Sequence, residues 1–290
     1  MNFLEFLKRQ EFVLLDGAMG TELDKKGLMS RGRNNIDAPQ EVLKIHRDYA
    51  NCGCNVLTTN TLTMNRIYIE THNVGVSVQE VNRAGAELAR QAAGKKLYVL
   101  GDISSTGQLL QPYGDYTEMQ FYGTFKEQAE VLAEAGVDGF IIETMFDLRE
   151  ALCALGACKD NFPLPAIVSM AFKTEANGGR TIMGNSAQEC AKALTDAGAD
   201  VIGANCGDID PLQMAAIVSL IRLETKLPIL AQPNAGKPKL VDDSTVFEMS
   251  PGEFAAGIKG CIRAGAKLVG GCCGTTPEHI SAVADLLGKK

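Results

Sequence analysis

The chain has 290 residues, and 28 Lys and Arg against 35 Asp and Glu give it a formal net charge of −7. Hydrophobic residues make up 46% of it, which is typical of a globular protein and excludes disorder as its main state. The negative charge argues against a general nucleic-acid binder. No apolar run reaches the roughly 18 residues that a membrane span needs, and the first residues lack the pattern of a secretory signal.

Eight apolar runs of strand length follow one another along the chain. They are nearly continuous in apolar residues rather than alternating, which is typical of parallel strands buried on both faces. The predicted strands are, in chain order, 12–16, 55–59, 97–102, 139–143, 166–170, 201–205, 228–232 and 267–271.

Helical patterns lie in the gaps between these strands. The clear ones are 39–52, 77–93, 121–135, 186–197, 211–224, 251–264 and 277–288. Eight strand–helix units in a chain of this length predict a (β/α)8 barrel, and no linker divides the chain, so we expect one domain over 1–290. The alternative is a doubly wound open sheet, which usually carries a Gly-rich nucleotide turn; none follows the first strand.

The active site of such a barrel lies at the C-terminal ends of its strands, so the residues that end the strands are the candidates for chemistry. Among them are Asp16, Asp102, Glu143, Cys206, Asn234, Cys272 and Cys273. Asp16 begins a loop with Gly17, Ala18 and Met19, and Asp102 is followed by a segment that it could simply cap.

Nine cysteines in a chain without an export signal indicate reduced thiols in the cytoplasm rather than a disulfide framework. Three of them, Cys206, Cys272 and Cys273, end strands separated by a single strand, or roughly 10 Å. Three thiolates with one open position are the pattern of a catalytic zinc site. Cys272 and Cys273 are adjacent, so both can reach one metal only if the backbone turns there, as the flanking glycines allow.

The alternative interpretation of these three cysteines is simple burial. We apply it to the remaining six, which fall on or beside predicted helices and are expected to pack in the core. They are Cys52, Cys54, Cys153, Cys158, Cys190 and Cys261.

Six segments resemble the homocysteine S-methyltransferase family: DGAMGTEL (16–23), TTNTL (58–62), IIETM (141–145), GANCG (203–207), QPNAGKP (232–238) and GGCCGTTPEHI (270–280). The resemblance covers nearly the whole chain. It implies a (β/α)8 barrel that binds Zn2+ through the three cysteines and methylates the thiol of homocysteine to methionine. It also implies that Asp16 and Glu143 contact homocysteine. Their carboxylates can accept hydrogen bonds from its ammonium group, and the N–H groups of Gly17, Ala18 and Met19 can hold its carboxylate.

The chemistry of the predicted ligands fits a thiol substrate. A free thiol with a pKa of about 8.5 is mostly protonated at neutral pH, and zinc binding deprotonates it. When thiolates bind zinc, their excess negative charge leaves the bound sulfur electron-rich and favours its alkylation, whereas histidine ligands favour activation of water.

The prediction of the methyl donor depends mainly on features that the sequence lacks. Without Trp, a cage for the quaternary ammonium of betaine is disfavoured. The segments around the cysteines are most similar to the homocysteine module of cobalamin-dependent methionine synthase. Since the chain has no room for a corrinoid domain, we expect a methylcorrinoid on a separate protein. S-methylmethionine is the alternative donor, and a non-catalytic barrel that only binds zinc or a thiol is the alternative of another class.

The last candidate residue is the one that would occupy the open coordination position of the metal. Asn234 follows the strand between those that carry the cysteines. We predict that its amide oxygen is the resting fourth ligand or bonds a water there, and that homocysteine displaces it because zinc in this site prefers sulfur. The alternative is that Asn234 only fixes its own turn.

Overall fold

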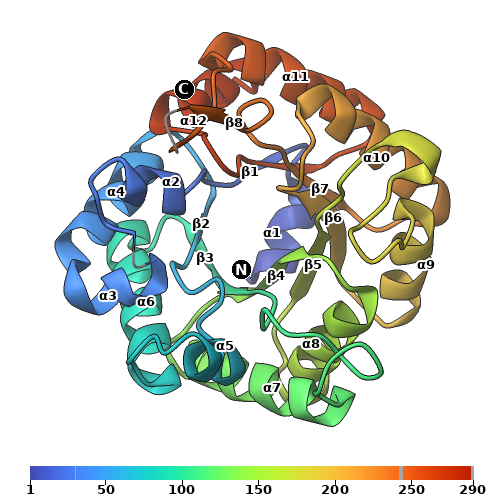
Figure 1. Cartoon of the computed structure of the whole chain (residues 1–290). Coiled ribbons are helices and arrows are strands. Elements are labelled where there is room, and N and C mark those ends of the chain that lie inside the picture. The colour runs from blue at the N-terminus through green and yellow to red at the C-terminus, as the bar shows by residue number, and fades with distance from the viewer. Residues whose placement is uncertain (30, 242–243, 289–290) are drawn as a thin grey trace.

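The computed structural model describes residues 1–29, 31–241 and 244–288. Its main sheet has eight parallel strands in the order β1-β10-β7-β6-β5-β4-β3-β2. A parallel bridge between Leu15 and Val56 joins β1 to β2 and closes the sheet into a barrel, with the helices around it (Figure 1). The predicted barrel is confirmed.

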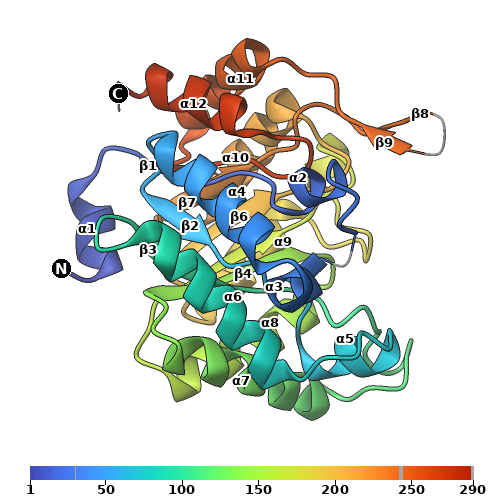
Figure 2. The same cartoon turned by 90° about the vertical axis from the view of Figure 1, so that its left-hand side faces the viewer.

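All eight predicted strands are present in the barrel. They are β1 (Val13–Leu14), β2 (Val56–Thr58), β3 (Tyr98–Ile103), β4 (Gly139–Met145), β5 (Ala166–Met170), β6 (Val201–Asn205), β7 (Ile229–Gln232) and β10 (Leu268–Val269). A small antiparallel hairpin, β8 (Lys239–Val241) with β9 (Ser244–Val246), projects beyond one end of the barrel (Figure 2).

The seven predicted helices correspond to α4 (Pro39–Asn51), α6 (Val78–Ala93), α7 (Glu118–Glu134), α9 (Ala187–Asp196), α10 (Pro211–Glu224), α11 (Pro251–Ala264) and α12 (Pro277–Leu286). The sequence analysis did not identify α8 (Leu148–Asn161), whose buried face consists largely of Ala and Cys and gives a weak apolar period. Shorter helices are α1 (Phe3–Arg9), α2 (Gly20–Asp24), α3 (Asn34–Asp37) and α5 (Arg66–Thr71), with single 3-10 turns at Arg31–Arg33 and Ala176–Gly178.

Alternate residues of each strand point to opposite sides of the barrel wall. In β1, Val13 belongs to the cluster inside the barrel, whereas Leu14 belongs to the larger cluster between strands and helices. The inner cluster contains one large apolar residue from each of the eight strands, Leu15 just after β1, and Phe3 and Leu7 from α1. Helix α1 therefore plugs the end of the barrel opposite the hairpin (Figure 2), and a capping box between Asn2 and Glu5 starts it.

Among the described residues, no helix combines the length and the apolar character that a bilayer span requires.

Candidate functional site

The three predicted cysteines lie together at the C-terminal ends of the strands. The sulfur atoms of Cys206, Cys272 and Cys273 all lie within 4.8 Å of one another. The Cys206 and Cys273 sulfurs are 3.7 Å apart, and those of Cys272 and Cys273 are 4.0 Å apart. Both residues of the Cys-Cys pair follow the end of β10, where the backbone turns as the sequence required.

The segment after β7 positions the cysteines from both sides. The N–H of Cys206 donates to Gln232, that of Cys272 donates to Pro233, and the carbonyl of Cys273 accepts from Ala235. Since these bonds are all to the backbone, the spacing between the two cysteine segments depends on the path of the chain rather than on flexible side chains.

Cys206 has an unusual backbone conformation. Its φ is +54°, in the left-handed region that residues other than glycine rarely adopt, and Gly207 follows at +66°. At Gly207 a Cβ would lie 2.0 Å from the carbonyl oxygen of Phe172, so only glycine fits. Strain of this kind persists where the surrounding structure holds it and is common at functional sites.

The spacing of the three sulfurs fits a zinc ion. Ligands at about 2.3 Å in a tetrahedron leave about 3.8 Å between sulfurs, and the two measured separations bracket that value. The thiols also interact with one another. Hydrogen bonds from Cys206 and Cys272 lower the pKa of the Cys273 thiol to about 3, whereas hydrogen bonds with Cys206 and Cys273, together with burial, raise the pKa of Cys272. Three thiolates at this spacing would repel one another, so a cation is needed to hold all three.

Two buried carboxyl groups, those of Asp16 and Asp102, and the half-buried Glu143 lie at the same end of the barrel as the cysteines. Asp16 and Asp102 are each 4% exposed. Burial raises the pKa of Asp16 to about 7, and burial together with the charge of Asp16 raises the pKa of Glu143 to about 8. Burial and then the charges of Glu143 and Asp16 raise the pKa of Asp102 as well. Burial therefore disfavours the ionised form of all three groups, and the negative charges nearby further disfavour ionisation of Glu143 and Asp102. A positive charge placed among them would favour their ionised forms.

The loop after β1 is pinned to the loop after β10. The N–H of Ala18 donates to the hydroxyl of Thr275, and its carbonyl accepts from the hydroxyl of Tyr49. At Gly17 a Cβ would lie 2.8 Å from the Thr275 oxygen, so glycine is required. The Ala18 N–H therefore already has a hydrogen-bond partner within the protein. Within the described part of the chain, the N–H groups of Gly17 and Met19 have no such bond.

Buried acceptors without a protein partner gather at the same end. Among the described residues they include Asp102 Oδ1, Gln232 Oε1 and Asn234 Oδ1. Buried polar atoms are nearly always satisfied, so unpaired ones indicate a missing ligand or water. The Asn234 side chain does not bond its own turn: its amide nitrogen donates to the carbonyl of Gly207, next to Cys206, at 2.8 Å.

The sequence analysis did not select Asn205, which is fully buried. Its amide nitrogen lies 2.9 Å from Glu143 Oε2 and 3.8 Å from the sulfur of Cys272, so it contacts both groups of candidates. The available signal was its place as the last residue of β6, directly before Cys206.

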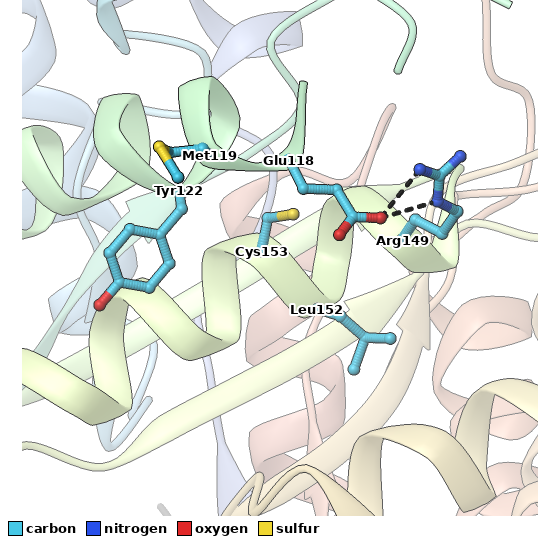
Figure 3. Close-up of a pocket in the computed structure, with 6 residues that line it drawn as sticks. All are labelled: Glu118, Met119, Tyr122, Arg149, Leu152 and Cys153. Atoms are coloured by element: carbon cyan, nitrogen blue, oxygen red, sulfur yellow. Dashed lines mark hydrogen bonds and ion pairs between the residues drawn. The ribbon is translucent and has the colours of Figure 1, made fainter. Parts of the chain in front are cut away.

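The other six cysteines are free, and all but the half-buried Cys153 are buried. Cys153 lines a cavity of about 550 Å³ between α7 and α8, on the outer face of the barrel. Figure 3 shows the Glu118–Arg149 ion pair at this cavity. Because its lining includes none of the clustered cysteines or carboxylates, we assign it no part in the site.

Known proteins resemble this chain over nearly its whole length. Methionine synthase of Mycobacterium leprae is 28% identical over 95% of the chain, and that of Mycobacterium tuberculosis is also 28% identical over 95%. The chain spans about a quarter of the length of these relatives, 24% in each case.

Among solved structures, the metallated form of homocysteine methyltransferase MmuM from Escherichia coli superposes with a TM-score of 0.79 at 22% identity, covering 97% of this chain and 98% of that one. The Y628A variant of the carboxyl transferase domain of Rhizobium etli pyruvate carboxylase has a TM-score of 0.58 at 16% identity. This match covers 99% of this chain and 45% of that one. At these identities the structures confirm the barrel fold alone. The family model for homocysteine S-methyltransferase matches residues 13–287, so the chain belongs to this family of methyltransferases.

Proposed function

We propose that this protein transfers a methyl group to the thiol of homocysteine, giving methionine, with Zn2+ held by Cys206, Cys272 and Cys273. The observation that carries the proposal is the grouping of three sulfurs, all within 4.8 Å of one another, at the same end of the barrel as the buried Asp16 and Asp102 and the half-buried Glu143. The first cluster suits a thiolate-binding metal and the second suits an ammonium group, and homocysteine carries both a thiol and an ammonium. Three thiolate ligands have to stay reduced, so we place this reaction in the cytoplasm.

When bound by these cysteines, zinc would supply one thing: it would keep the substrate sulfur deprotonated at neutral pH. In the reaction the sulfur attacks the methyl carbon, a C–S bond forms, and the bond from that carbon to its carrier breaks. The electron pair of the broken bond stays with the carrier, and the thiol proton goes to solvent.

The chain's own residues would hold the amino acid end of the substrate. Glu143 and Asp16 accept hydrogen bonds from the ammonium group, and Asp102 has a buried oxygen free to accept another. A positive charge among these carboxyl groups would favour their ionised forms. The free N–H groups of Gly17 and Met19 would bind the substrate carboxylate, whereas that of Ala18 already donates to Thr275.

Asn234 is our candidate for the fourth position on the metal before substrate binds. Its buried amide oxygen has no partner among the residues that the structure describes, and its amide nitrogen donates to the carbonyl of Gly207, the residue after Cys206. A neutral, hard oxygen would leave readily for the thiolate of homocysteine.

For the donor we propose a methylcorrinoid carried by another protein or domain. Support comes from the similarity to methionine synthases, in which a region like this chain is about a quarter of a longer protein. S-methylmethionine is the second candidate. Betaine is disfavoured because the chain has no Trp to hold its quaternary ammonium.

The test is a methylation assay on the zinc-loaded protein with homocysteine and each donor in turn: methylcobalamin or a methylcorrinoid protein, S-methylmethionine, and betaine. We expect methionine with a corrinoid donor and much less with the others. Methionine only from S-methylmethionine would correct the donor. Tight binding of zinc and homocysteine without product from any donor would support a binding barrel instead.

A further inference from the structure

The amide of Asn205 is held in one orientation by its neighbours. Its Oδ1 accepts hydrogen bonds from the backbone N–H of Thr144 at 2.9 Å and from the hydroxyl of Ser169 at 2.7 Å. A backbone N–H can only donate, so the oxygen has to face Thr144. The amide nitrogen then faces the other way, toward Glu143 Oε2 at 2.9 Å and the Thr144 hydroxyl at 2.7 Å.

The segment that Asn205 holds is a β-bulge. The register between β4 and β5 pairs Ile142 with Val168 and Met145 with Met170, so Glu143 and Thr144 occupy a stretch with one extra residue. Bulges re-aim side chains and are frequent beside active sites. Thr144 within this bulge has a φ of +58°, which is strained for a β-branched residue.

Asn205 stabilises this bulge from β6, across β5. Both its amide oxygen and its amide nitrogen bond Thr144, and Ser169 of the intervening strand fixes the amide in place. The Ser104 hydroxyl donates to the backbone carbonyl of Glu143. Among the described residues, the amide of Asn205 is the one side chain that donates a hydrogen bond to the carboxylate of Glu143.

The same nitrogen lies 3.8 Å from the sulfur of Cys272, and the residue after Asn205 is Cys206. One buried amide thus contacts a carboxylate proposed to bind the substrate ammonium and a thiol proposed to bind zinc. From this geometry we propose that Asn205 is the positioning residue that sets Glu143 at the distance from the metal site that homocysteine spans. The inference rests on the proposed function and deepens its substrate recognition.

The test compares two thiols on zinc-loaded protein by calorimetric titration. Homocysteine uses both the metal and Glu143, whereas ethanethiol has no ammonium group and uses only the metal. Asn205→Ala should weaken homocysteine binding about 10- to 150-fold, the range for losing a hydrogen bond to a charged group. Ethanethiol affinity and zinc content should be unchanged.

Asn205→Asp serves as a second variant, because it keeps the shape of the side chain and the acceptor for Thr144 but replaces the donor with a carboxylate facing Glu143. It should lose homocysteine affinity at least as strongly. Ser169→Ala is the matched control: it removes a buried hydrogen bond to the same amide on the Oδ1 side and leaves the donor to Glu143. It should change homocysteine affinity much less.

A double-mutant cycle separates this role from general support of the fold. In a Glu143→Ala background, Asn205→Ala should lower homocysteine affinity by less than about twofold, because residues that act through one partner are not additive. The inference is overturned if the two substitutions are fully additive, or if homocysteine affinity is unchanged in both Asn205 variants. A parallel loss of ethanethiol affinity or a loss of zinc would overturn it as well. If the wild-type protein itself fails to bind homocysteine, the proposed function fails instead.

Discussion

The two ends of the barrel are built on opposite principles. At the N-terminal end, Phe3 and Leu7 of α1 are buried against the apolar interior. At the other end, carboxyl groups and amides are buried next to half-buried thiols, and several acceptors have no partner among the described residues. Thr144 and Cys206 there have left-handed backbones. Burying polar groups without partners costs stability. The N-terminal, closed end therefore stabilises the protein, whereas the preformed site at the other, open end lowers its stability.

The largest effect is expected at the cysteines of the open end. Replacing Cys272 or Cys273 by Ala should abolish nearly all methyl transfer and most zinc binding, because two thiolates form an incomplete site. The barrel should stay folded, since the site lies at the end of the strands and not in the apolar core. Zinc content and circular dichroism check this. Full zinc content in either variant would refute the assignment.

At the closed end, a substitution should lower stability and leave ligand binding unchanged. Leu7 is almost fully buried inside the barrel, and Leu7→Ala should lower the free energy of unfolding by about 2–5 kcal/mol through lost burial and a cavity. Homocysteine affinity at the other end should not change. Denaturant unfolding and calorimetric titration measure the two quantities. Stability like that of the wild type would show that α1 is not a plug.

Unpaired polar atoms away from the open end should affect stability alone. His46 in α4 is buried, and neither ring nitrogen has a partner among the described residues. Burial lowers its pKa to about 4, below the unfolded value of about 6.5. Between these values the unfolded chain binds a proton that the folded chain does not, so stability falls as pH falls through this window.

The ionisation of His46 should lower the free energy of unfolding by about 3 kcal/mol as pH falls through this window, at about 1.4 kcal/mol for each pKa unit. His46→Leu should remove that part of the pH dependence, measured as the difference from the wild type in urea unfolding between pH 4 and pH 7, whatever its effect at neutral pH. Parallel curves for the two proteins would contradict the argument.

The smallest effect should come from a single recognition group. Glu143→Ala should weaken homocysteine binding by roughly 1.5–3 kcal/mol, the loss of a hydrogen bond to a charged group, and leave zinc content unchanged. Calorimetric titration and metal analysis decide it. Homocysteine affinity equal to that of the wild type would remove Glu143 from the site and reduce the open end to the cysteines.

The barrel could be predicted because its signals are local. A buried parallel strand has to be continuously apolar, and a glycine often ends the helix before it, so the eight strands and seven of the helices are readable one segment at a time. Closure then follows from the number of strand–helix units, and the common edge of the strands brings Cys206, Cys272 and Cys273 together.

Other features depend on contacts between distant segments and were decided only by the tertiary structure. Thr275 engages the N–H of Ala18 across 257 positions, and no local pattern indicates it. The bulge at Thr144 and the orientation of the Asn205 amide follow from packing among three strands, since Asn205 reaches Glu143 from 62 residues away. Sequence alone determined which chemistry the end of the barrel carries, whereas tertiary contacts decided which of its atoms are still free to bind a ligand.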